Sequence, residues 1–447
     1  MANILMFSYS NITWTKEHYF DSFISSFADV LIRNGNNVFN VDLLNLKEKE
    51  EELNNAINKF KPNMIITFNN AIHNTSFVKK LNIPILLYPS DGVDYFHNKN
   101  FLSKNLERYW FFDINKYHRD SLLNYFPEIN INRFIHFGYV TDFHRKEVEQ
   151  DINISFLGSI PNHDISIIRY MRKRCSNKFN KDFFLALEEF RLHPENKFPL
   201  FIDNFQSDLG ISIETIAVWL ITCKDRFEIL SELFPCELKL YGYSSFLDCG
   251  IYNYNFIKAY NNKLCVTKDE VEMLYNRSKI SLNLPNARAS NGLSWRVPDI
   301  MASQSVILSY ENSELRKLFN KYMDIPMYRS KSEAKEIVNK LLHDHTLRKD
   351  IVLASNIIVE EMCRFEKYLI NIENSLNISI LNGKNGNLYE FYNDKNIQVA
   401  NINDKNMYYR IKKIYKNGIK WEKVPIEMVK LLPYFLAKKI IRKNKHR

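Results

Sequence analysis

Glycine is scarce in this sequence, with 11 residues in a chain of 447. Neither GxGxxG nor GxxxxGKS/T occurs, and these are the two familiar glycine-rich loops that wrap around phosphate groups. Their absence excludes both kinds of loop, so any phosphate must be held in another way.

Cysteine motifs and long apolar runs are also absent. The six cysteines show no CxxC spacing, and no set of His, Cys and Asp has the spacing of metal ligands. We expect neither disulfides nor a bound metal, although Mg²⁺ could accompany a diphosphate without being essential. No stretch approaches the ~18 apolar residues of a membrane-spanning helix. The run Ile4–Phe7 is interpreted as a core strand and not as a signal peptide, which predicts a cytoplasmic protein.

The net charge of +10 is concentrated near the C-terminus. Residues 410–447 carry 13 Lys and Arg and two acids, a net +11, so the other residues hold 48 Lys and Arg against 49 acids, a net −1. Within this region, Lys423–Arg447 is amphipathic, so it could lie on an anionic membrane surface. The alternative is a helix that packs on the first domain. A neutral body argues against nucleic acid as a partner.

Short apolar runs alternate with helical patterns over residues 1–148. The predicted strands are 4–8, 37–43, 63–68, 85–88, 109–112 and 133–137. Apolar strands separated by helices indicate a parallel sheet covered on both faces. We expect a Rossmann-like N-terminal domain that binds the acceptor.

An apolar run at 153–158 resembles the first strand of the N-terminal domain and predicts the first strand of a second domain. It follows the polar stretch 142–151, which is interpreted as a hinge. A second Rossmann-like domain is predicted over 149–375, with a helical insertion at about 180–233 and a C-terminal extension over 376–447. Its predicted strands are 153–158, 237–242, 264–266, 280–284 and 305–308. Two doubly wound sheets joined by a hinge would face each other across a cleft, where ligands bind at the carboxyl ends of the strands.

The most informative segment runs from a helix through the strand 280–284 and a polar loop to a helix that opens near Ser294. Its exposed amides and Arg296, a forked cation, would bind a diphosphate without a metal. Asp299, one turn later, could accept two ribose hydroxyls. Alternatively, Arg296 is a surface residue paired with Asp299, and Asp299 only complements the helix dipole.

These motifs resemble a known family. The runs Leu274–Leu284, Arg296–Ser303 and Val306–Leu315 are similar to the C-terminal domain of the "glycosyl transferases group 1" family, most closely its spore-maturation-type (CgeB-like) branch. In that branch the strand reads roughly S-K-I-x-L-N and the next helix R-x-x-E-x-x-A. The resemblance covers about residues 152–375. It implies a GT-B glycosyltransferase that binds a nucleotide-sugar donor mainly through its second domain.

The resemblance also assigns roles to single residues. Asp299 stands where the family has a ribose-binding Glu, and Arg296 where it has an Arg facing the diphosphate. Many relatives have two Glu eight positions apart, but Asn291 replaces the first here, so neither its sugar contact nor the stereochemistry is predicted. The other expected donor contacts are Gly158, Ser159, Tyr241, Gly242, Asn283, Gly292, Ser294, Glu311, Asn312 and Ser313. Turn glycines, a strand-end Asn and a helix N-cap are the alternatives for several of these.

An acceptor hydroxyl needs a general base, and the first domain offers Asp91, Asp94 and His18. Loop aspartates are often turn residues, and His18 could be a surface or capping residue. Together these features predict transfer of a sugar to a glycan or lipid-linked acceptor in bacterial surface polysaccharide or lipopolysaccharide synthesis, with the protein peripheral at the inner membrane face. A sugar-nucleotide epimerase of the same fold and a non-catalytic sugar- or nucleotide-binding protein are the alternatives.

Overall fold

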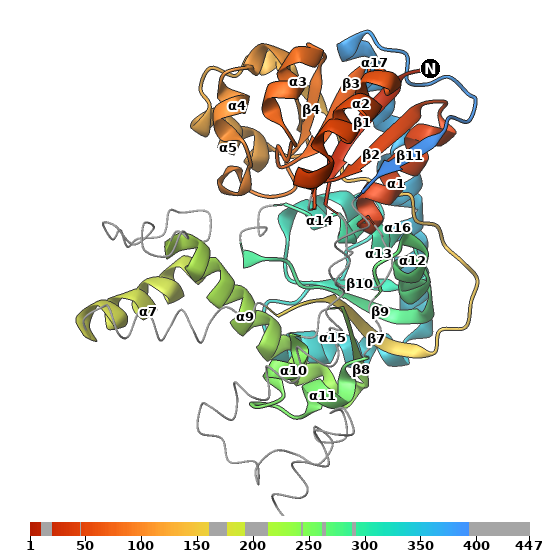
Figure 1. The fold of residues 1–447 in the computed structure, drawn as a ribbon. Helices are drawn as coiled ribbons and strands as arrows, with labels where there is room; N and C mark the ends of the chain where they lie inside the picture. The colour runs from red at the N-terminus through yellow and green to blue at the C-terminus, as the bar shows by residue number, and fades with distance from the viewer. Residues whose placement is uncertain are drawn as a thin grey trace, which may run out of the picture.

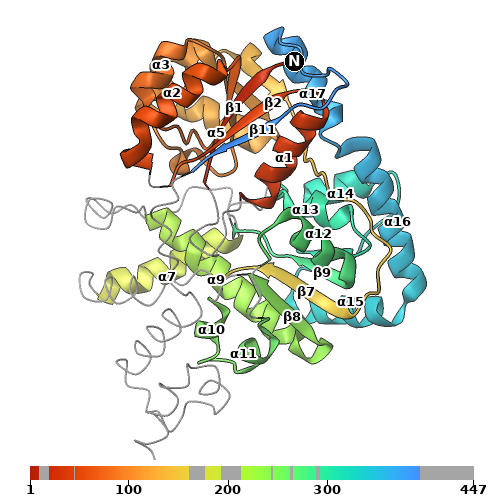
Figure 2. The same ribbon diagram turned by 45° about the vertical axis from the view of Figure 1, so that its right-hand side comes forward.

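The computed structural model places the chain in two α/β domains, one above the other (Figures 1 and 2). The first domain contains a seven-stranded sheet and the second a four-stranded sheet, and all pairings between the described strands are parallel. This confirms the predicted arrangement of two Rossmann-like domains. The described residues are 1–9, 20–44, 46–160, 177–192, 213–242, 245–261, 265–287 and 292–392.

The sheet of the first domain has the strand order β11-β2-β1-β3-β4-β5-β6. Strand β3 is buried along its whole length, as expected for a parallel sheet with helices on both faces. The strands are β1 (Asn3–Ser8), β2 (Asn37–Asp42), β3 (Met64–Phe68), β4 (Ile85–Tyr88), β5 (Tyr109–Asp113), β6 (Phe134–His136) and β11 (Leu388–Phe391).

Helices cover this sheet unequally. Helix α1 (Ser22–Arg33) and the late helix α17 (Glu366–Leu376) pack on one face, and the other face is covered by α2 (Glu50–Phe60), α3 (Thr75–Leu81), α4 (Lys99–Ser103) and α5 (Lys116–Tyr125). Asp21 is the N-cap residue of α1, and its side chain accepts a hydrogen bond from the Phe23 amide at 2.9 Å. This cap ends the strand-to-helix connection and fixes the direction in which α1 leaves the sheet.

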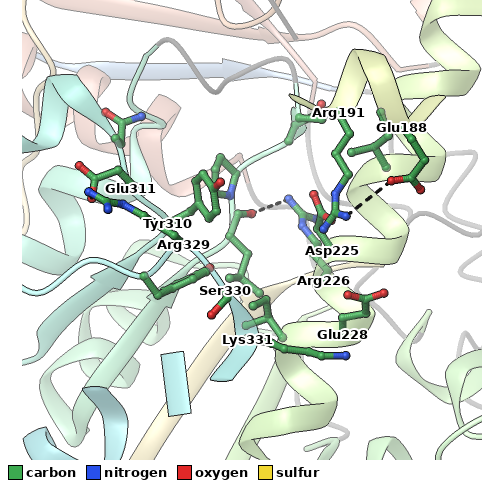
Figure 3. Close-up of a pocket in the computed structure, with 18 residues that line it drawn as sticks. Glu188, Arg191, Asp225, Arg226, Glu228, Tyr310, Glu311, Arg329, Ser330 and Lys331 are labelled. Carbon is green, nitrogen blue, oxygen red and sulfur yellow. Dashed lines mark hydrogen bonds and ion pairs between the residues drawn. The ribbon is translucent and has the colours of Figure 1, made fainter. Parts of the chain in front are cut away.

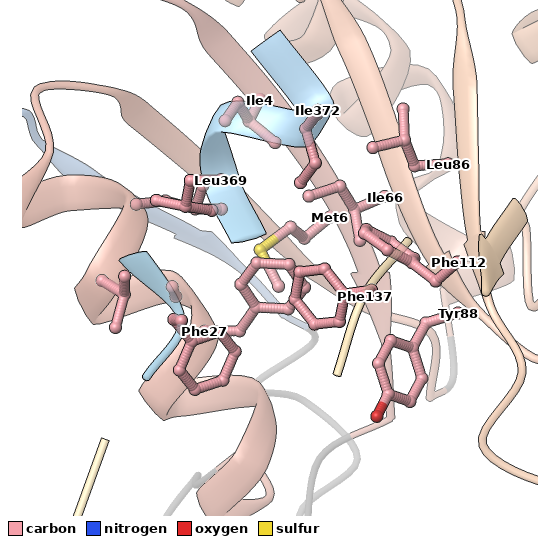
Figure 4. Packing of buried hydrophobic residues seen from close by; sticks show 14 of the residues in the cluster. Ile4, Met6, Phe27, Ile66, Leu86, Tyr88, Phe112, Phe137, Leu369 and Ile372 are labelled. Atoms are coloured by element: carbon pink, nitrogen blue, oxygen red, sulfur yellow. The ribbon is translucent and has the colours of Figure 1, made fainter. Parts of the chain in front are cut away.

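Residues distant in sequence complete the core of the first domain. Figure 4 shows Leu369 and Ile372 of α17 beside strand residues of β1 and Phe27 of α1. Each buried aliphatic side chain of this size stabilises the fold by about 2 kcal/mol. The sequence boundary at residue 375 groups α17 with the second domain, whereas its apolar face packs in the first. Strand β11 follows and pairs with β2 at the sheet edge.

The second sheet has the order β10-β9-β7-β8. Because β7 lies between β8 and β9, the chain leaves it first to one side and later to the other, which makes the carboxyl ends of β7 and β9 the topological switch point. The strands are β7 (Ile152–Gly158), β8 (Leu238–Gly242), β9 (Ser278–Asn283) and β10 (Val306–Ser309).

The two faces of the second sheet are covered by different helices. One carries α9 (Ile213–Leu233), α10 (Phe246–Cys249), α11 (Asn255–Ala259) and α15 (Lys331–His343), and the other α12 (Lys268–Arg277), α13 (Arg296–Met301), α14 (Ser313–Phe319) and α16 (His345–Met362). The predicted helical insertion contains α7 (Asn177–Leu192), and α9 is the crossover to β8. The predicted strand 264–266 is wrong for Cys265 and Val266, which form no strand, and Leu264 lies outside the described residues.

The chain crosses between the domains twice, and the two crossings run side by side. The Thr141 amide donates to the Cys363 carbonyl at 2.8 Å, and the Arg364 guanidinium donates to the Phe143 carbonyl at 2.6 Å. Residues 142–151, the predicted hinge, therefore do not connect the domains alone. A second segment, between α16 and α17, is hydrogen-bonded to the hinge.

A network of charges joins α1, the first crossing and α12. Asp142 accepts hydrogen bonds from Arg33 at 2.5 and 2.9 Å and from Lys268 at 2.5 Å, and Lys268 also pairs with Asp29 at 3.0 Å. The Asp142 side chain is 5% exposed. Burial alone would raise the pKa of Asp142, but the hydrogen bonds and charges of Arg33 and Lys268 hold it below its usual value.

The substitution Asp142→Asn should destabilise the folded chain by about 2 kcal/mol, because it removes a buried charge from three charge-assisted hydrogen bonds. Asp151→Asn is the matched control, since Asp151 pairs with Arg277 where both side chains are more than two-fifths exposed, and it should cost less than about 1 kcal/mol. Urea-unfolding midpoints measure both. Equal losses in the two variants would contradict a stabilising role for the network.

The basic segment 423–447 and the rest of 393–447 lie outside the described residues. Among the helices that the structure describes, none is both long and apolar enough to cross a bilayer.

Candidate functional site

A buried arginine occupies the switch point of the second sheet. Arg226, on α9, donates from Nη1 to the Ser159 carbonyl at 2.7 Å and from Nη2 to the Leu284 carbonyl at 2.8 Å. These carbonyls directly follow β7 and β9, so the guanidinium spans the gap between the two strand ends. Its Nε is buried and has no hydrogen-bond partner in the described part of the chain.

A second guanidinium lies on the same aromatic ring. The Cζ atoms of Arg226 and Arg296 are 5.8 and 6.0 Å from the ring centroid of Phe156 in β7. Burial, and then the positive charge of Arg296, lower the pKa of Arg226 to about 9. Two cations this close repel each other, so a bound anion would relieve an unfavourable interaction.

Two acids, Asp21 and Asp299, lie near Arg296. Burial raises the pKa of Asp299 to about 8, and it also raises the pKa of Asp21 despite the Phe23 amide and the charge of Arg296. Neither acid is within ion-pair distance of Arg296, and no ion pair joins Arg226 to another described residue. Because no described carboxylate forms an ion pair with Arg226 or Arg296, the two guanidinium groups remain available to an external anion.

The predicted ribose ligand Asp299 lies in the contact between the domains. It is 7% exposed, and its Oδ1 accepts a hydrogen bond from the Thr141 hydroxyl at 2.5 Å. Arg296 instead forms a side-chain hydrogen bond with Tyr275, whose pKa is raised by burial. This geometry leaves Asp299 little room for ribose hydroxyls, and the ribose contact stays a prediction.

Several predicted donor residues come together around the loop that precedes α13. The Ser294 hydroxyl donates to Asn283 Oδ1 at 3.2 Å, and Asn283 Nδ2 donates to the Ser309 hydroxyl at 2.9 Å. Asn312 donates to the Gly292 carbonyl at 3.1 Å and also caps α14, which begins at Ser313. The ends of β9 and β10 thus hold the loop over the switch point. Asn291 lies outside the described residues.

The remaining predicted donor residues sit at the ends of β7 and β8. Gly242 has φ +108°, and a Cβ there would lie 2.4 Å from the Gly158 carbonyl oxygen, so the two strand ends approach as only glycine permits. Tyr241 is 6% exposed and packs in the core, which leaves it no open face for a nucleobase. Ser159 contributes its carbonyl to Arg226.

The candidate bases in the first domain are only partly described. Asp91 is exposed and exchanges two hydrogen bonds with Asn69, at 2.8 and 3.0 Å, which is the geometry of a turn residue at the edge of the sheet. The backbone of Asp94 lies in a short 3₁₀ turn (Val93–Tyr95). His18 lies outside the described residues. Their catalytic roles stay predictions.

A polar trio that the sequence analysis did not identify faces the donor loop across the interdomain contact. Asn115 Nδ2 donates to the Tyr139 hydroxyl at 3.1 Å and lies 3.2 Å from His118 Nδ1. A Cβ on Gly292 would be 3.0 Å from Asn115 Nδ2, which shows how close the two domains come here. Burial lowers the pKa of His118 to about 4, so its imidazole is neutral at pH 7. The only sequence signal is an Asn N-cap three residues before a His, directly after a strand.

A cavity of about 550 Å³ opens beside the switch point, between α9 and the loops that follow β9 and β10 (Figure 3). Glu311 and Asn312, both predicted donor contacts, line it together with Arg226. Glu311 is held by Arg316 at 2.9 Å. The charged residues of its lining are Glu188, Arg191, Asp225, Arg226, Glu228, Glu311, Arg329 and Lys331.

Comparison with known proteins relates the second domain to glycosyltransferases. Residues 226–364 match the protein-family model described as "Glycosyl transferase-like". The match begins at Arg226 and includes Arg296 and the loops after β9 and β10. The second domain is therefore glycosyl transferase-like, and two facing Rossmann-like domains make the fold a GT-B fold. The spore-maturation-type branch stays a prediction. No curated protein sequence is significantly similar to the chain.

Three solved structures illustrate the similarity in architecture. The β-glucosyltransferase of T4 phage in complex with UDP-glucose is 13% identical, with a TM-score of 0.46 over 84% of this chain and 100% of that chain. Sucrose-phosphate synthase from Thermosynechococcus elongatus is 9% identical, with a TM-score of 0.49 over 84% and 98%. HepE from Anabaena, in complex with UDP and glucose, is 8% identical, with a TM-score of 0.47 over 84% and 100%. At these values the alignments identify no substrate for this chain.

The depressed pKa of His118 should make the chain sensitive to acid. An unfolded histidine titrates near ~6.5, so protonation favours the unfolded chain, and the stability due to the neutral imidazole is lost as pH falls from ~6.5 toward 4. Between pH 7 and pH 5 the loss should be about 2 kcal/mol for this residue. Urea unfolding at both pH values should show a smaller acid effect in His118→Gln than in the unmodified chain. The exposed residue His136 provides the control, and an equal reduction in His136→Gln would contradict the assignment.

Proposed function

We propose that this protein is a glycosyltransferase that moves a sugar from a nucleoside-diphosphate donor to a hydroxyl of a glycan or lipid-linked acceptor. The observation that carries the proposal is the pair of guanidinium groups of Arg226 and Arg296 at the switch point, neither of which forms an ion pair with a described residue. The glycosyl transferase-like match over residues 226–364 supports the same reading.

The proposed chemistry follows from where charge develops. As the bond between the sugar and the diphosphate breaks, negative charge grows on the leaving phosphate oxygens, and fixed cations in a partly buried site stabilise it without reorganising. Arg296 would supply two parallel N–H donors to the phosphates. Arg226 is committed to two carbonyls through Nη1 and Nη2, so it would act mainly through its charge. Mg²⁺ could accompany the diphosphate, but no step requires it.

The acceptor base remains to be assigned among Asp91, Asp94 and His18, and His118 is a further candidate. Its neutral imidazole lies in the trio beside Gly292, close to where the sugar would be released. A base with so low a pKa would be available in its deprotonated form at neutral pH.

The diphosphate assignment is tested by nucleotide binding. A panel of UDP, GDP, ADP and their sugar derivatives should contain one nucleotide that raises the melting temperature by mass action. Arg296→Ala should weaken its binding roughly 10- to 100-fold and lower turnover by orders of magnitude, with folding intact. Arg277→Ala is the control, because Arg277 is exposed and pairs only with Asp151 among the described residues.

Unchanged nucleotide binding in Arg296→Ala would count against the diphosphate site. Binding of a nucleotide sugar without transfer or hydrolysis would instead favour the non-catalytic alternative, which Asn291 supports because it replaces an expected Glu.

The setting is proposed to be bacterial surface polysaccharide synthesis at the inner face of the membrane. The support is the charge of residues 410–447, a net +11 beside a nearly neutral body. Each Lys or Arg near an anionic surface adds about 1 kcal/mol of attraction. The full chain should therefore float with liposomes containing phosphatidylglycerol, and a 1–420 truncation should not. Equal flotation of both would contradict a membrane role for the tail.

A further inference from the structure

The cavity beside the switch point has walls from two parts of the second domain. In Figure 3, Tyr310, Glu311 and Arg329 face Glu188, Arg191 and Asp225 across the open space. The second group belongs to α7 and α9, so the helical insertion and the crossover helix build this wall together. We call this space the flank pocket and define it by these six residues together with Arg226, Glu228 and Lys331.

The charges of the flank pocket are balanced. Its four carboxylates are matched by four cations, and Arg226, one of these cations, already belongs to the proposed diphosphate site. The pocket outside that site therefore carries no excess of positive charge, which a phosphorylated ligand would require. A neutral ligand fits this balance.

The side chains are fixed in pairs that present donors next to acceptors. Arg191 contacts Asp225 at 2.7 Å, and Glu311 contacts Arg316 at 2.9 Å and Arg329 at 3.6 Å. Carboxylates held in this way keep free lone pairs, and guanidinium groups keep free N–H donors. Vicinal hydroxyl groups, which both donate and accept, match such a surface.

Apolar surface accompanies these polar pairs. Leu284, Pro285 and Ile221 line the pocket, as does Tyr310, which is 50% exposed. An exposed aromatic face beside hydrogen-bonding groups suits a pyranose ring, whose C–H face is apolar and whose edge carries hydroxyls. The volume of about 550 Å³ leaves room for more than one such ring.

The flank pocket is continuous with the proposed reaction centre. Asn312 lines it and donates to the Gly292 carbonyl of the donor loop, and Arg226 lies on the boundary between pocket and switch point. A saccharide bound here would have one end next to the sugar of a donor whose diphosphate lies between the two arginines.

We propose that the flank pocket is a saccharide subsite that holds the neutral, hydroxyl-rich end of the acceptor glycan. The acceptor would then be gripped partly by the second domain, through the helical insertion, and not by the first domain alone. This inference rests on the proposed transferase function for its role, although binding of free glycan does not depend on it.

A glycan array, probed with the full-length chain in saturating UDP, tests the proposal. Neutral glycans should bind, and Tyr310→Ala and the isosteric Glu228→Gln should each weaken binding roughly tenfold. Tyr125→Ala is the matched control, because Tyr125 is also 50% exposed but lies on α5 of the first domain. Tyr310→Phe should retain most of the affinity if the ring face is the contact.

Two measurements separate this inference from the proposed function. Arg296→Ala should lose UDP in calorimetry yet still bind the same glycans when UDP is omitted. The subsite is overturned if no glycan binds, or if the pocket variants bind glycans like the unmodified chain. It is also overturned if they lose UDP-sugar affinity relative to UDP while keeping glycan affinity, because the pocket would then hold the donor's sugar.

Discussion

The close approach of two positively charged arginines is the main constraint on the switch point of the second domain. Arg226 and Arg296 come from different helices and lie near one phenylalanine ring, and burial together with the charge of Arg296 lowers the pKa of Arg226. The fold nevertheless keeps both at the ends of β7 and β9. Such an arrangement costs folding free energy unless an anion is bound. The carbonyls of Ser159 and Leu284 offset part of that cost by accepting from Arg226.

The contact between the two domains includes the residue next to Arg296. The ring of Trp295, one residue before Arg296, lies 4.5 Å from the Phe23 ring of α1 at a tilt of 33°, and the Phe365 ring lies 5.7 Å from the same Phe23. The N-cap Asp21 and the buried Asp299 are close enough to sense each other's charge. Helix α1 of the first domain therefore packs against the start of α13. Any movement of the domains that separates Trp295 from Phe23 would also move the guanidinium of Arg296.

Features that depend on a local sequence pattern, such as the strands, could be predicted from the sequence. Features that depend on contacts between distant residues could not. Short apolar runs revealed ten of the eleven described strands, because burial on both faces demands such runs. Arg296 was found because its loop and helix form one continuous motif. Arg226 was missed because a residue in the middle of a long helix gives no sign that it reaches two strand ends. His118 was missed because the sequence does not show that its helix start faces Gly292 of the other domain. The return of α17 and β11 to the first domain was missed because no local pattern encodes a partner more than 200 residues away.

The return of α17 and β11 also sets an order of events during synthesis. Proteins emerge from the ribosome from their N-terminus, and early domains commonly fold first. Here the hydrophobic core of the first domain stays incomplete until Leu369 and Ile372 have emerged, and β2 remains an open sheet edge until β11 reaches it. All strands of the second sheet have been made by then. The domain encoded first is therefore the one that finishes last, and its exposed edge must be protected while translation continues.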